Sequence, residues 1–443
     1  MRERLDPAAI PAHVAKVASA LRAASGRAFL VGGPVRDLLL GRMPADWDIA
    51  TDLSPDDVLR VFPGATTVGI EFGRVEVDGV DVVSLRGESG YLDRRHPSFV
   101  TFGVPVEEDL KRRDFTINAM AAEFDELAVI DPFGGREDLA RRLVRTVGDP
   151  RERLAEDPLR ILRVVRFKTL LDMDLDPAIS GLLPEVTGTL ATVSGERVFS
   201  ELARILVSPA VCQGMRDLIA YGLGPIVLPE VFVGGEGDGA IAERTGRAMS
   251  LASLDLVTRL AVLFAVGAGD LYRGSALGAT HDQREALRAS EAAFDRFNVP
   301  SSLRRDVAWL LRGVGDSGLV GRALAGGENN AAYLARKLVD EAGREQVSRL
   351  VDVEQSAWRA AENQGLPGAA AAVAAGLREA GGEAAAVPGT LALTGEDVMA
   401  ILGKRGPVVG EALGYLKEAV LRDPSRNRRD LLEDALREWW RRR

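Results

Sequence analysis

Residues 32–48 read Gly-Gly-Pro-Val-Arg-Asp-Leu-Leu-Leu-Gly-Arg-Met-Pro-Ala-Asp-Trp-Asp, and this stretch decides the fold of the N-terminal third of the chain. It follows an apolar, β-prone run at Ala28–Gly32, so it predicts a strand, a glycine turn and then a helix over Pro34–Leu40. Adjacent glycines let a triphosphate approach the backbone, and a helix N-terminus offers N–H donors to it. A guanidinium one turn into the helix can form a fork onto phosphate oxygens. Gly33 and Arg36 are therefore candidate nucleotide-binding residues.

Two carboxylates, Asp46 and Asp48, lie two residues apart where the predicted strand Trp47–Thr51 begins. Residues i and i+2 of a strand point to the same side, so the two groups project together, about 7 Å apart. Such a pair repels, and a fold avoids it beside apolar neighbours unless a cation lies between the charges. Paired carboxylates can hold two metal ions for in-line displacement at phosphorus, and hard oxygen ligands favour Mg²⁺. Asp81, in the predicted strand Val80–Leu85, is a candidate third catalytic carboxylate.

The secondary-structure pattern changes along the chain. Apolar periodicity of the helical kind dominates from about Asp149, and no strand pattern is found after Val147. Gly365–Thr390 is a low-complexity stretch that could form a helical hairpin or a loose connection. Further strands are predicted at Arg74–Val77, Phe99–Phe102 and Leu127–Ile130, with an N-terminal helix at Ile10–Ala24.

Composition excludes several classes of protein. Hydrophobic residues make up 46% and charged residues 27%, which is typical of a globular protein. The longest apolar stretch, Leu260–Ala268, falls short of the ~20 residues that a membrane span needs. Cys212 is the single cysteine and the three histidines are scattered, which excludes an intrachain disulfide and a zinc cluster. With no secretory signal recognised, we expect a cytoplasmic protein without membrane contact or a disulfide-linked partner.

The charge of the chain is unevenly distributed. A net charge of −9 by itself argues against a nucleic-acid partner. Arg141–Lys168, however, holds nine Lys/Arg against four Asp/Glu, and Arg422–Arg443 holds eight against five. Binding depends on such local patches, so RNA contact is not excluded. For the C-terminal run, RNA contact and a solvated helix face remain equally open.

Further motifs follow in order. Residues 112–119 read Arg-Arg-Asp-Phe-Thr-Ile-Asn-Ala, 131–139 read Asp-Pro-Phe-Gly-Gly-Arg-Glu-Asp-Leu, 155–167 read Ala-Glu-Asp-Pro-Leu-Arg-Ile-Leu-Arg-Val-Val-Arg-Phe, and 196–202 read Glu-Arg-Val-Phe-Ser-Glu-Leu. Together with Gly32–Thr51, they resemble the head and neck motifs of class II tRNA nucleotidyltransferases (CCA-adding enzymes) and bacterial poly(A) polymerases. The resemblance is specific through about residue 208. Beyond it, only Leu393–Val398 and the following helix resemble the tail of the bacterial CCA-adding group.

This resemblance implies an α+β fold. A nucleotidyltransferase head of the polymerase beta type with a small mixed sheet (1–148) would precede a helical neck for nucleotide selection (149–211), a helical body (212–300) and a helical tail that binds tRNA (301–443). The implied activity is Mg²⁺-dependent, template-independent addition of C, C and A to the tRNA 3′ end from CTP and ATP, with release of pyrophosphate. Arg113 is implied to contact the nucleotide.

Selection of the base is predicted at Asp157 and Arg160. Residues three apart are neighbours on a helix face, which Arg163 and Arg166 continue, so an ordinary intrahelical ion pair is the alternative. Cytosine and adenine each present an amino donor beside a ring-nitrogen acceptor, whereas uracil and guanine present the reverse. A carboxylate beside a guanidinium therefore matches C and A and mismatches U and G. The resemblance assigns this role to Asp157 and Arg160, and Arg163 and Arg166 would neutralise triphosphate or RNA backbone.

Three alternatives remain open from the sequence. Poly(A) polymerase would share the head, although Gly69–Val75 resembles the CCA-adding pattern. A partial enzyme would add only A, or only CC. A non-enzymatic RNA-binding protein would need no Asp46/Asp48 pair. Arg86–Pro97, expected to be a flexible connection between strands, resembles the loop of enzymes that complete the terminal A.

Overall fold

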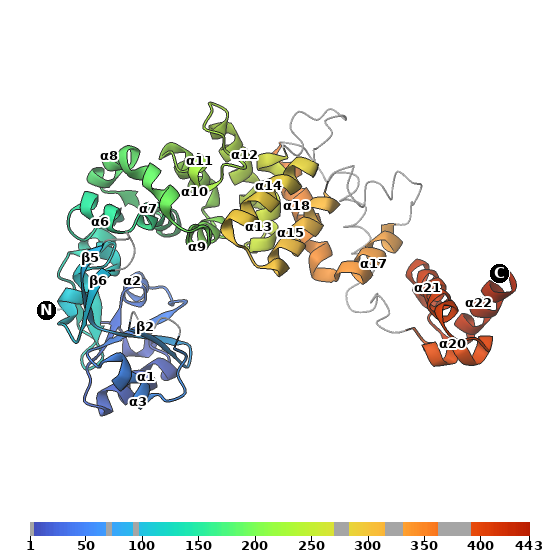
Figure 1. Cartoon of the computed structure of the whole chain (residues 1–443), viewed down its shortest axis with the longest axis horizontal. Coiled ribbons are helices and arrows are strands. Elements are labelled where there is room, and N and C mark those ends of the chain that lie inside the picture. The colour runs from blue at the N-terminus through green and yellow to red at the C-terminus, as the bar shows by residue number, and fades with distance from the viewer. Residues whose placement is uncertain (1–3, 68–72, 92–96, 270–282, 315–330, 362–390) are drawn as a thin grey trace. The chain divides into compact units, whose positions relative to one another are not determined.

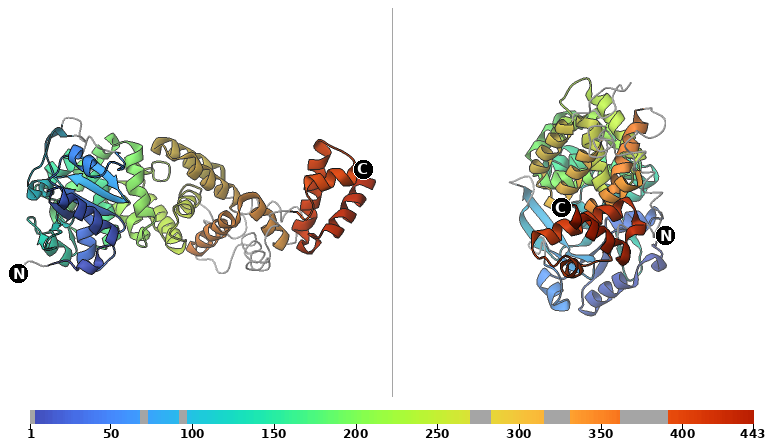
Figure 2. Two further views of the ribbon diagram at one scale, coloured as in Figure 1. Left: turned by 90° about the horizontal axis from the view of Figure 1, so that it is seen from below. Right: turned by 90° about the vertical axis from the view of Figure 1, so that its right-hand side faces the viewer.

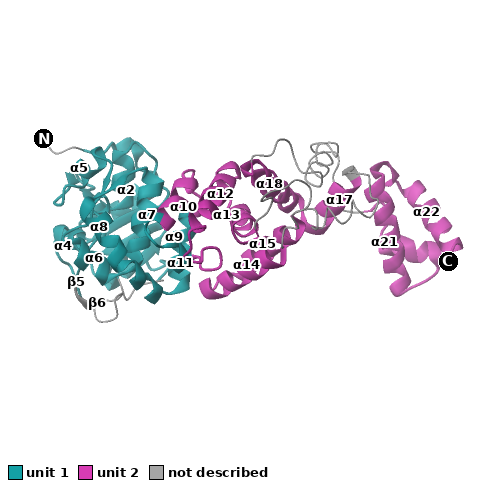
Figure 3. Cartoon of the chain, turned by 90° about the horizontal axis from the view of Figure 1, so that it is seen from above, with its two compact units in different colours: residues 1–205, 220–227 teal, residues 206–219, 228–443 magenta. Residues whose placement is uncertain are grey.

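The computed structural model describes residues 4–67, 73–91, 97–269, 283–314, 331–361 and 391–443. The chain forms two compact units, residues 1–205 with 220–227 and residues 206–219 with 228–443 (Figure 3). Among the described residues, every helix is too short or too polar to cross a membrane. The low-complexity stretch Gly365–Thr390 and most of the Gly69–Val75 motif lie outside the described residues.

A mixed sheet in the first unit carries the candidate catalytic carboxylates. Its described strands follow the order β3-β4-β2-β1-β7-β8, in which β2 and β4 are parallel and the other neighbours antiparallel. The parallel register sets Asp48 directly beside Asp81. Two aspartates far apart in sequence thus become neighbours. The strands are β1 (Ala28–Val31), β2 (Trp47–Thr51), β3 (Arg74–Val77), β4 (Val80–Ser84), β7 (Ala121–Glu123) and β8 (Val129–Ile130).

Helices cover both faces of this sheet (Figure 1). On one face, α1 (Ala12–Ala23) lies against β1 and β2, and α3 (Pro55–Val61) lies against β3. On the other face, Phe29, Val31 and Ala50 form a core with apolar residues of α4 (Val106–Lys111). Side chains alternate along a strand, so Asp48 points to the same face as Ala50 and lies at the edge of this core.

The predicted strands and the first helices agree closely with the structure, apart from one connection. β2 and β3 have the predicted bounds, and the predicted helix Pro34–Leu40 is α2 (Gly33–Leu39). The expectation of a flexible connection over Arg86–Pro97 is wrong for its first half. β5 (Arg86–Tyr91) pairs antiparallel with β6 (Pro97–Phe102). The residues of β5 include glycines and have a low strand propensity, but hydrogen bonds from the partner strand hold their backbone in a strand. Residues 92–96 lie outside the described residues.

Helices follow the sheet. In the first unit these are α5 (Gly135–Ala140), α6 (Pro150–Glu156), α7 (Leu159–Leu171), α8 (Pro177–Val186), α9 (Gly195–Leu206) and α11 (Gly224–Val227). The unit also contains the 3-10 turns η1 (Pro7–Ala9) and η3 (Thr116–Asn118), which precede these helices, and η4 (Thr187–Thr192). The expected absence of strands after Val147 is wrong at one place. The two-residue strand β10 (Asp174–Leu175) pairs in parallel with β9 (Leu143–Val144) and is too short to leave a sequence pattern.

The helix face expected to run from Asp157 through Arg166 begins two residues later than expected. α6 ends at Glu156, Asp157 is extended (φ −144°, ψ 101°), and α7 begins only at Leu159. Pro158 is the cause, because a proline disfavours the helical conformation of the residue before it. The Asp157 carboxylate accepts the Leu159 N–H at 3.1 Å and so caps α7.

The second unit is helical throughout its described residues. Its elements are α10 (Val211–Ala220), α12 (Asp238–Leu251), α13 (Leu256–Val262), the π-helical turn η5 (Leu263–Ala268), α14 (Gln283–Phe297), α15 (Ser301–Gly313), α17 (Ala331–Ala342), α18 (Arg344–Ala360), α20 (Gly395–Leu402), α21 (Pro407–Arg422), η6 (Pro424–Arg426) and α22 (Arg429–Arg441). The helices α20, α21 and α22, red in Figures 1 and 2, share an apolar core of their own. The predicted order of a sheet-containing head followed by helices is confirmed.

A matched pair of glycines tests this packing. At the start of α5, a Cβ on Gly135 would lie 2.9 Å from the backbone carbonyl carbon of Thr116 and 3.1 Å from Met120. We expect Gly135→Ala to destabilise the protein by about 1–3 kcal/mol, because backbone must move. Gly181 in α8 has open space around it, so Gly181→Ala should stabilise by about 0.5–1 kcal/mol. Denaturant unfolding measures both; equal effects would contradict the packing of α5 on η3.

Candidate active site

Asp48 is held in an unfavourable electrostatic environment. Asp48 is partly buried beside Asp81, while Asp46, just before β2, is exposed. The pKa of Asp48 is raised to about 6: burial is the largest cause, the negative charges of Asp81 and Asp46 act in the same direction, and Arg113 opposes them. The sheet therefore concentrates carboxylates that repel one another, as the sequence predicted for Asp46 and Asp48.

Asp81 already has a cationic partner. Its carboxylate accepts two hydrogen bonds from Arg74, at 3.0 Å from Nε and 2.8 Å from Nη2. Within the described parts of the chain, no three Asp, Glu, His or Cys side chains are grouped so as to hold a metal ion. Asp46 and Asp48 therefore stay the predicted metal ligands, and Asp81 contributes negative charge beside Asp48.

Arg113 lies between these carboxylates and the glycine turn. Its guanidinium bonds to the buried Asp109 (3.3 and 3.1 Å), which also accepts from Arg112 at 2.7 Å. Burial alone would raise the pKa of Asp109, but Arg113 and Arg112 hold it below its ordinary value. Gly32 has a φ of +72°, and a Cβ there would lie 2.6 Å from Arg113 Nη1. Glycine at this position is thus required by both the backbone and the arginine.

The predicted phosphate ligand Arg36 is tied to the motif at residues 112–119. It donates from Nη1 to Asn118 Oδ1 at 2.6 Å and from Nε to Asp37 at 2.8 Å. Its guanidinium also lies 5.4 Å from the ring centre of Phe167 on α7. Gly33, the first residue of α2, has Arg36 Nη2 as the nearest side-chain atom to a Cβ built on it, at 3.8 Å. The turn and Arg36 are therefore adjacent, as expected.

Arg163 and Arg166 belong to a buried ion network. Arg163 donates to Asp114 at 2.7 Å, and both arginines pair with Glu201 on α9, at 3.5 and 2.9 Å. Burial would raise the pKa of Asp114, yet Arg163 and Arg160 lower it to about 2. Burial lowers the pKa of Arg166 to about 10, with Arg163 adding to the effect. Arg166 is only 5% exposed. These ion pairs join α7 to α9 and to the segment that contains Asp114.

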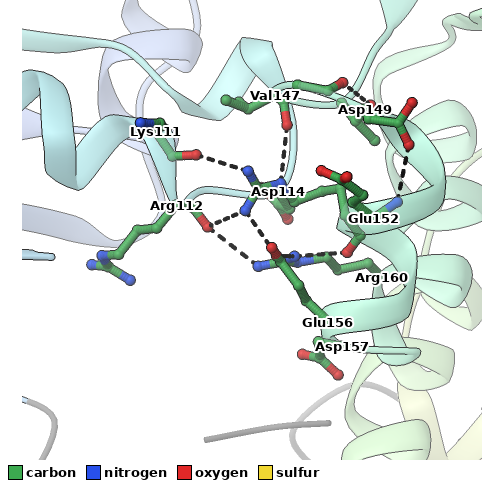
Figure 4. A network of polar contacts seen from close by, with 12 residues as sticks. Lys111, Arg112, Asp114, Val147, Asp149, Glu152, Glu156, Asp157 and Arg160 are labelled. Carbon is green, nitrogen blue, oxygen red and sulfur yellow. Dashed lines mark hydrogen bonds and ion pairs between the residues drawn. The ribbon is translucent and has the colours of Figure 1, made fainter. Parts of the chain in front are cut away.

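Asp157 and Arg160 do not pair with each other. Asp157 bonds to Arg197 Nη2 at 2.7 Å. Arg160 donates to Glu156 at 2.6 Å, to the carbonyl of Arg153 at 2.7 Å and to the carbonyl of Arg112 at 3.2 Å. In Figure 4 the Arg160 guanidinium extends toward Arg112, and the Asp157 carboxylate lies apart from it. The two side chains thus form no ion pair, and they do not lie side by side in the way that the base-matching prediction assumes.

Sequence reasoning missed the residues that bond to the candidate site residues or share their acceptors: Asp109, Arg153, Glu156, Arg197 and Glu201. Asp109 could have been found, because it stands four residues before Arg113 at the end of a helical segment. Glu156 could have been found by its spacing of three and four residues from Arg153 and Arg160. Arg197 and Glu201 come from a distant helix, so no local spacing identifies them.

Comparisons with known proteins agree with this architecture. A family model described as "Poly A polymerase head domain" matches residues 28–145, and one described as "Probable RNA and SrmB- binding site of polymerase A" matches 172–233. A CCA-adding enzyme of Geobacillus sp. (strain WCH70) is 43% identical over 200 residues, 44% of this chain and 49% of that protein. One of Levilactobacillus brevis is 41% identical over 211 residues, 47% and 53% of the two chains. These alignments span about half the length of the curated relatives.

Solved structures extend the similarity to the helical part. The crystal structure of the Bacillus stearothermophilus CCA-adding enzyme in complex with CTP matches with a TM-score of 0.64 and 30% identity, over 97% of each chain. The Thermotoga maritima CCA-adding enzyme complexed with tRNA has the same fold, with a TM-score of 0.57 and 20% identity over 99% of this chain. The chain therefore belongs to the CCA-adding enzyme family, and the resemblance drawn from its motifs is confirmed.

Substituting Asp48 tests the electrostatics of the site. The pKa of Asp48 in the folded state, about 6, lies above the ordinary aspartate value of 3.8, so the folded state binds this proton more tightly than the unfolded chain does. Above about pH 6 Asp48 is ionised in the folded protein, and its charge lowers the free energy of unfolding by the full amount. This loss becomes smaller as the pH falls and disappears by about pH 4. In chelator at pH 7.5, Asp48→Asn should raise the free energy of unfolding by about 1–3 kcal/mol.

The control is Asp78→Asn, at an exposed turn between β3 and β4, which should change stability little. Thermal melts at pH 7.5 and near pH 4 provide the comparison. A gain for Asp48→Asn that persists unchanged at the lower pH would show that charge repulsion is not its cause.

Proposed function

We propose that the protein adds C, C and A to the 3′ end of tRNA, using CTP and ATP and releasing pyrophosphate. The observation that supports this most directly is the group of repelling carboxylates, Asp48, Asp81 and Asp46, beside Arg113 and the glycine turn. Acidic groups next to a phosphate-binding guanidinium are the arrangement needed for phosphoryl transfer. The matches over whole chains favour tRNA addition, since the head alone is shared with poly(A) polymerases.

The reaction assigns roles to residues of this chain. The 3′-hydroxyl oxygen of the RNA bonds to the α-phosphorus while the bond to the bridging oxygen breaks and pyrophosphate leaves. Gly33, Arg36 and Arg113 are proposed to hold the triphosphate, and the buried partners Asp109 and Asn118 fix the two guanidiniums. Correct orientation of the α-phosphate is what this part of the chain contributes.

A divalent cation fits the carboxylates. We propose that Asp46 and Asp48 hold Mg²⁺, because burial and like charge leave the Asp48 carboxylate in need of a positive partner that Arg113 supplies only in part. When bound, the ion would lower the pKa of the attacking hydroxyl and offset charge on the phosphates. Asp81, already bonded to Arg74, is proposed to strengthen the negative field at this point.

The helices are proposed to select the nucleotide and to bind the RNA. Asp157 and Arg160 are the proposed base-selecting pair. Arg163 and Arg166, expected to neutralise triphosphate or RNA backbone, already have Asp114 and Glu201 as partners and are proposed to hold α7 in place instead. Residues 301–443 are the proposed tRNA-binding tail. In the tail, Tyr415 is 38% exposed and stacks on Trp439 at 5.8 Å, a ring pair of the kind on which unpaired bases stack. The single cysteine suits action in a reducing cytoplasm.

The proposal is tested by offering a tRNA that lacks its 3′ CCA together with one labelled nucleotide at a time. We expect two C additions from CTP alone, and one A after both C residues are present. A long tail from ATP alone would identify a poly(A) polymerase, and an enzyme stopping after CC, or adding only A, would be the partial form. In the same assay, Asp48→Ala and Asp46→Ala should abolish addition of both nucleotides. Near-normal C addition by either variant at ordinary Mg²⁺ would overturn the metal assignment.

Base selection is tested separately. Asp157→Ala or Arg160→Ala should weaken discrimination against UTP by about 1–3 kcal/mol, because each removes half of the hydrogen-bond pattern. The measurement is kcat/KM for CTP and for UTP on the same tRNA. A slower enzyme with unchanged CTP preference would return both residues to a structural or phosphate-binding role.

A further inference from the structure

Arg153 on α6 is bonded in a way that an ordinary surface arginine is not. Its guanidinium donates from Nε to the carbonyl of Val147 at 2.9 Å, from Nη2 to that of Lys111 at 3.1 Å and from Nη1 to that of Arg112 at 3.4 Å. Nη1 also donates to Glu156 Oε2 at 2.8 Å. The side chain is 14% exposed. Arg153 thus ties α6 to Lys111 and Arg112, which directly precede Arg113 in the chain.

Arg153 and Arg160 share two acceptors. Glu156 Oε2 accepts from Arg153 at 2.8 Å and from Arg160 at 2.6 Å. The Arg112 carbonyl accepts from Arg153 at 3.4 Å and from Arg160 at 3.2 Å. The acceptors that locate the Arg160 guanidinium are therefore themselves located by Arg153, because the planar fork of an arginine fixes the relative positions of the groups it bonds.

The position of this brace gives it a consequence beyond local stability. Asp157 follows Glu156 directly and lies in the break between α6 and α7, where extended backbone leaves its placement to its neighbours. α6 is fixed at its other end by Asp149, which caps it by accepting the N–H groups of Arg151 and Glu152 (2.9 and 3.1 Å). Between the two ends of α6, Arg153 bonds the helix to the carbonyls of Lys111 and Arg112.

We propose that Arg153 is a positioning residue for base selection: through Glu156 and the Arg112 carbonyl it sets the place of Arg160, and through α6 that of Asp157. The inference rests on the proposed function only in taking Asp157 and Arg160 as the base-selecting pair. Without the guanidinium of Arg153, Glu156 and Arg160 can move together as an ion pair. The Arg160 guanidinium then has no fixed distance from the base. A positioning error of this kind weakens discrimination more than it weakens chemistry.

The test compares Arg153→Ala with Arg151→Ala in the full-length protein. Arg151 stands on the same helix, but its guanidinium bonds to the exposed Glu185 at 2.6 Å and is itself 62% exposed. Two quantities are measured: equilibrium binding of CTP and UTP by calorimetry, and kcat/KM for both nucleotides on tRNA lacking CCA. Arg153→Ala should reduce the preference for CTP over UTP about tenfold, mainly through Kd and KM, whereas Arg151→Ala should leave it unchanged.

A merely structural role would lower the melting temperature and the rate with every nucleotide while leaving the preference intact, and that result would overturn the proposal. If Arg153→Ala does not fold, Arg153→Lys takes its place, because it keeps the charge but cannot reach all four acceptors together; it should lose part of the preference. An unaltered protein that binds CTP over UTP but adds neither to tRNA would refute the proposed function and leave the binding comparison decisive. An unaltered protein without any preference would overturn both.

Discussion

The arginines of the candidate site are fixed by carboxylates that each serve two of them. Asp109 accepts from Arg112 and Arg113, and in the same manner Glu156 and Glu201 each pair with two arginines on α6 or α7. Removing one such acid takes a negative partner away from two arginines at once, and a buried cation that loses its partner typically costs several kcal/mol. These acids therefore define where the arginines of the site are held, although none of the acids is proposed to touch the nucleotide.

This pairing changes what the local charge excess means. The positive run from Arg141 to Lys168 is compensated in three dimensions by acids from other segments, among them Asp114 and Glu185. At the C-terminus, Arg429 likewise pairs with Asp397 of another helix at 2.6 Å. The potential that an RNA meets is consequently smaller than the count along the chain indicates. Recognition of RNA would therefore depend more on the positions of a few arginine side chains than on the number of arginines.

The similarity in sequence to relatives covers a smaller part of the chain than the similarity in fold. Sequence alignment with curated relatives covers 44% of the chain at 43% identity, whereas the fold match covers 97% at 30%. Charged networks such as Asp114–Arg163 need particular side chains at particular distances. Helix packing, by contrast, is satisfied by many apolar residues of suitable volume. The helical half can therefore keep its architecture while its sequence changes.

The sequence by itself determined the strand–turn–helix at residues 28–40, the carboxylate pair Asp46/Asp48, the family and the succession of sheet and helices, because these depend on local spacing and on motifs. Only the tertiary structure decided that Asp81 lies beside Asp48, since parallel pairing of β2 and β4 joins distant segments. It also decided that Asp157 lies outside the helix expected to contain it, and that Arg160 bonds to Glu156 and the Arg112 carbonyl while Asp157 bonds to Arg197. A guanidinium can reach several acceptors, and which of them it meets depends on the backbone that folding brings within range.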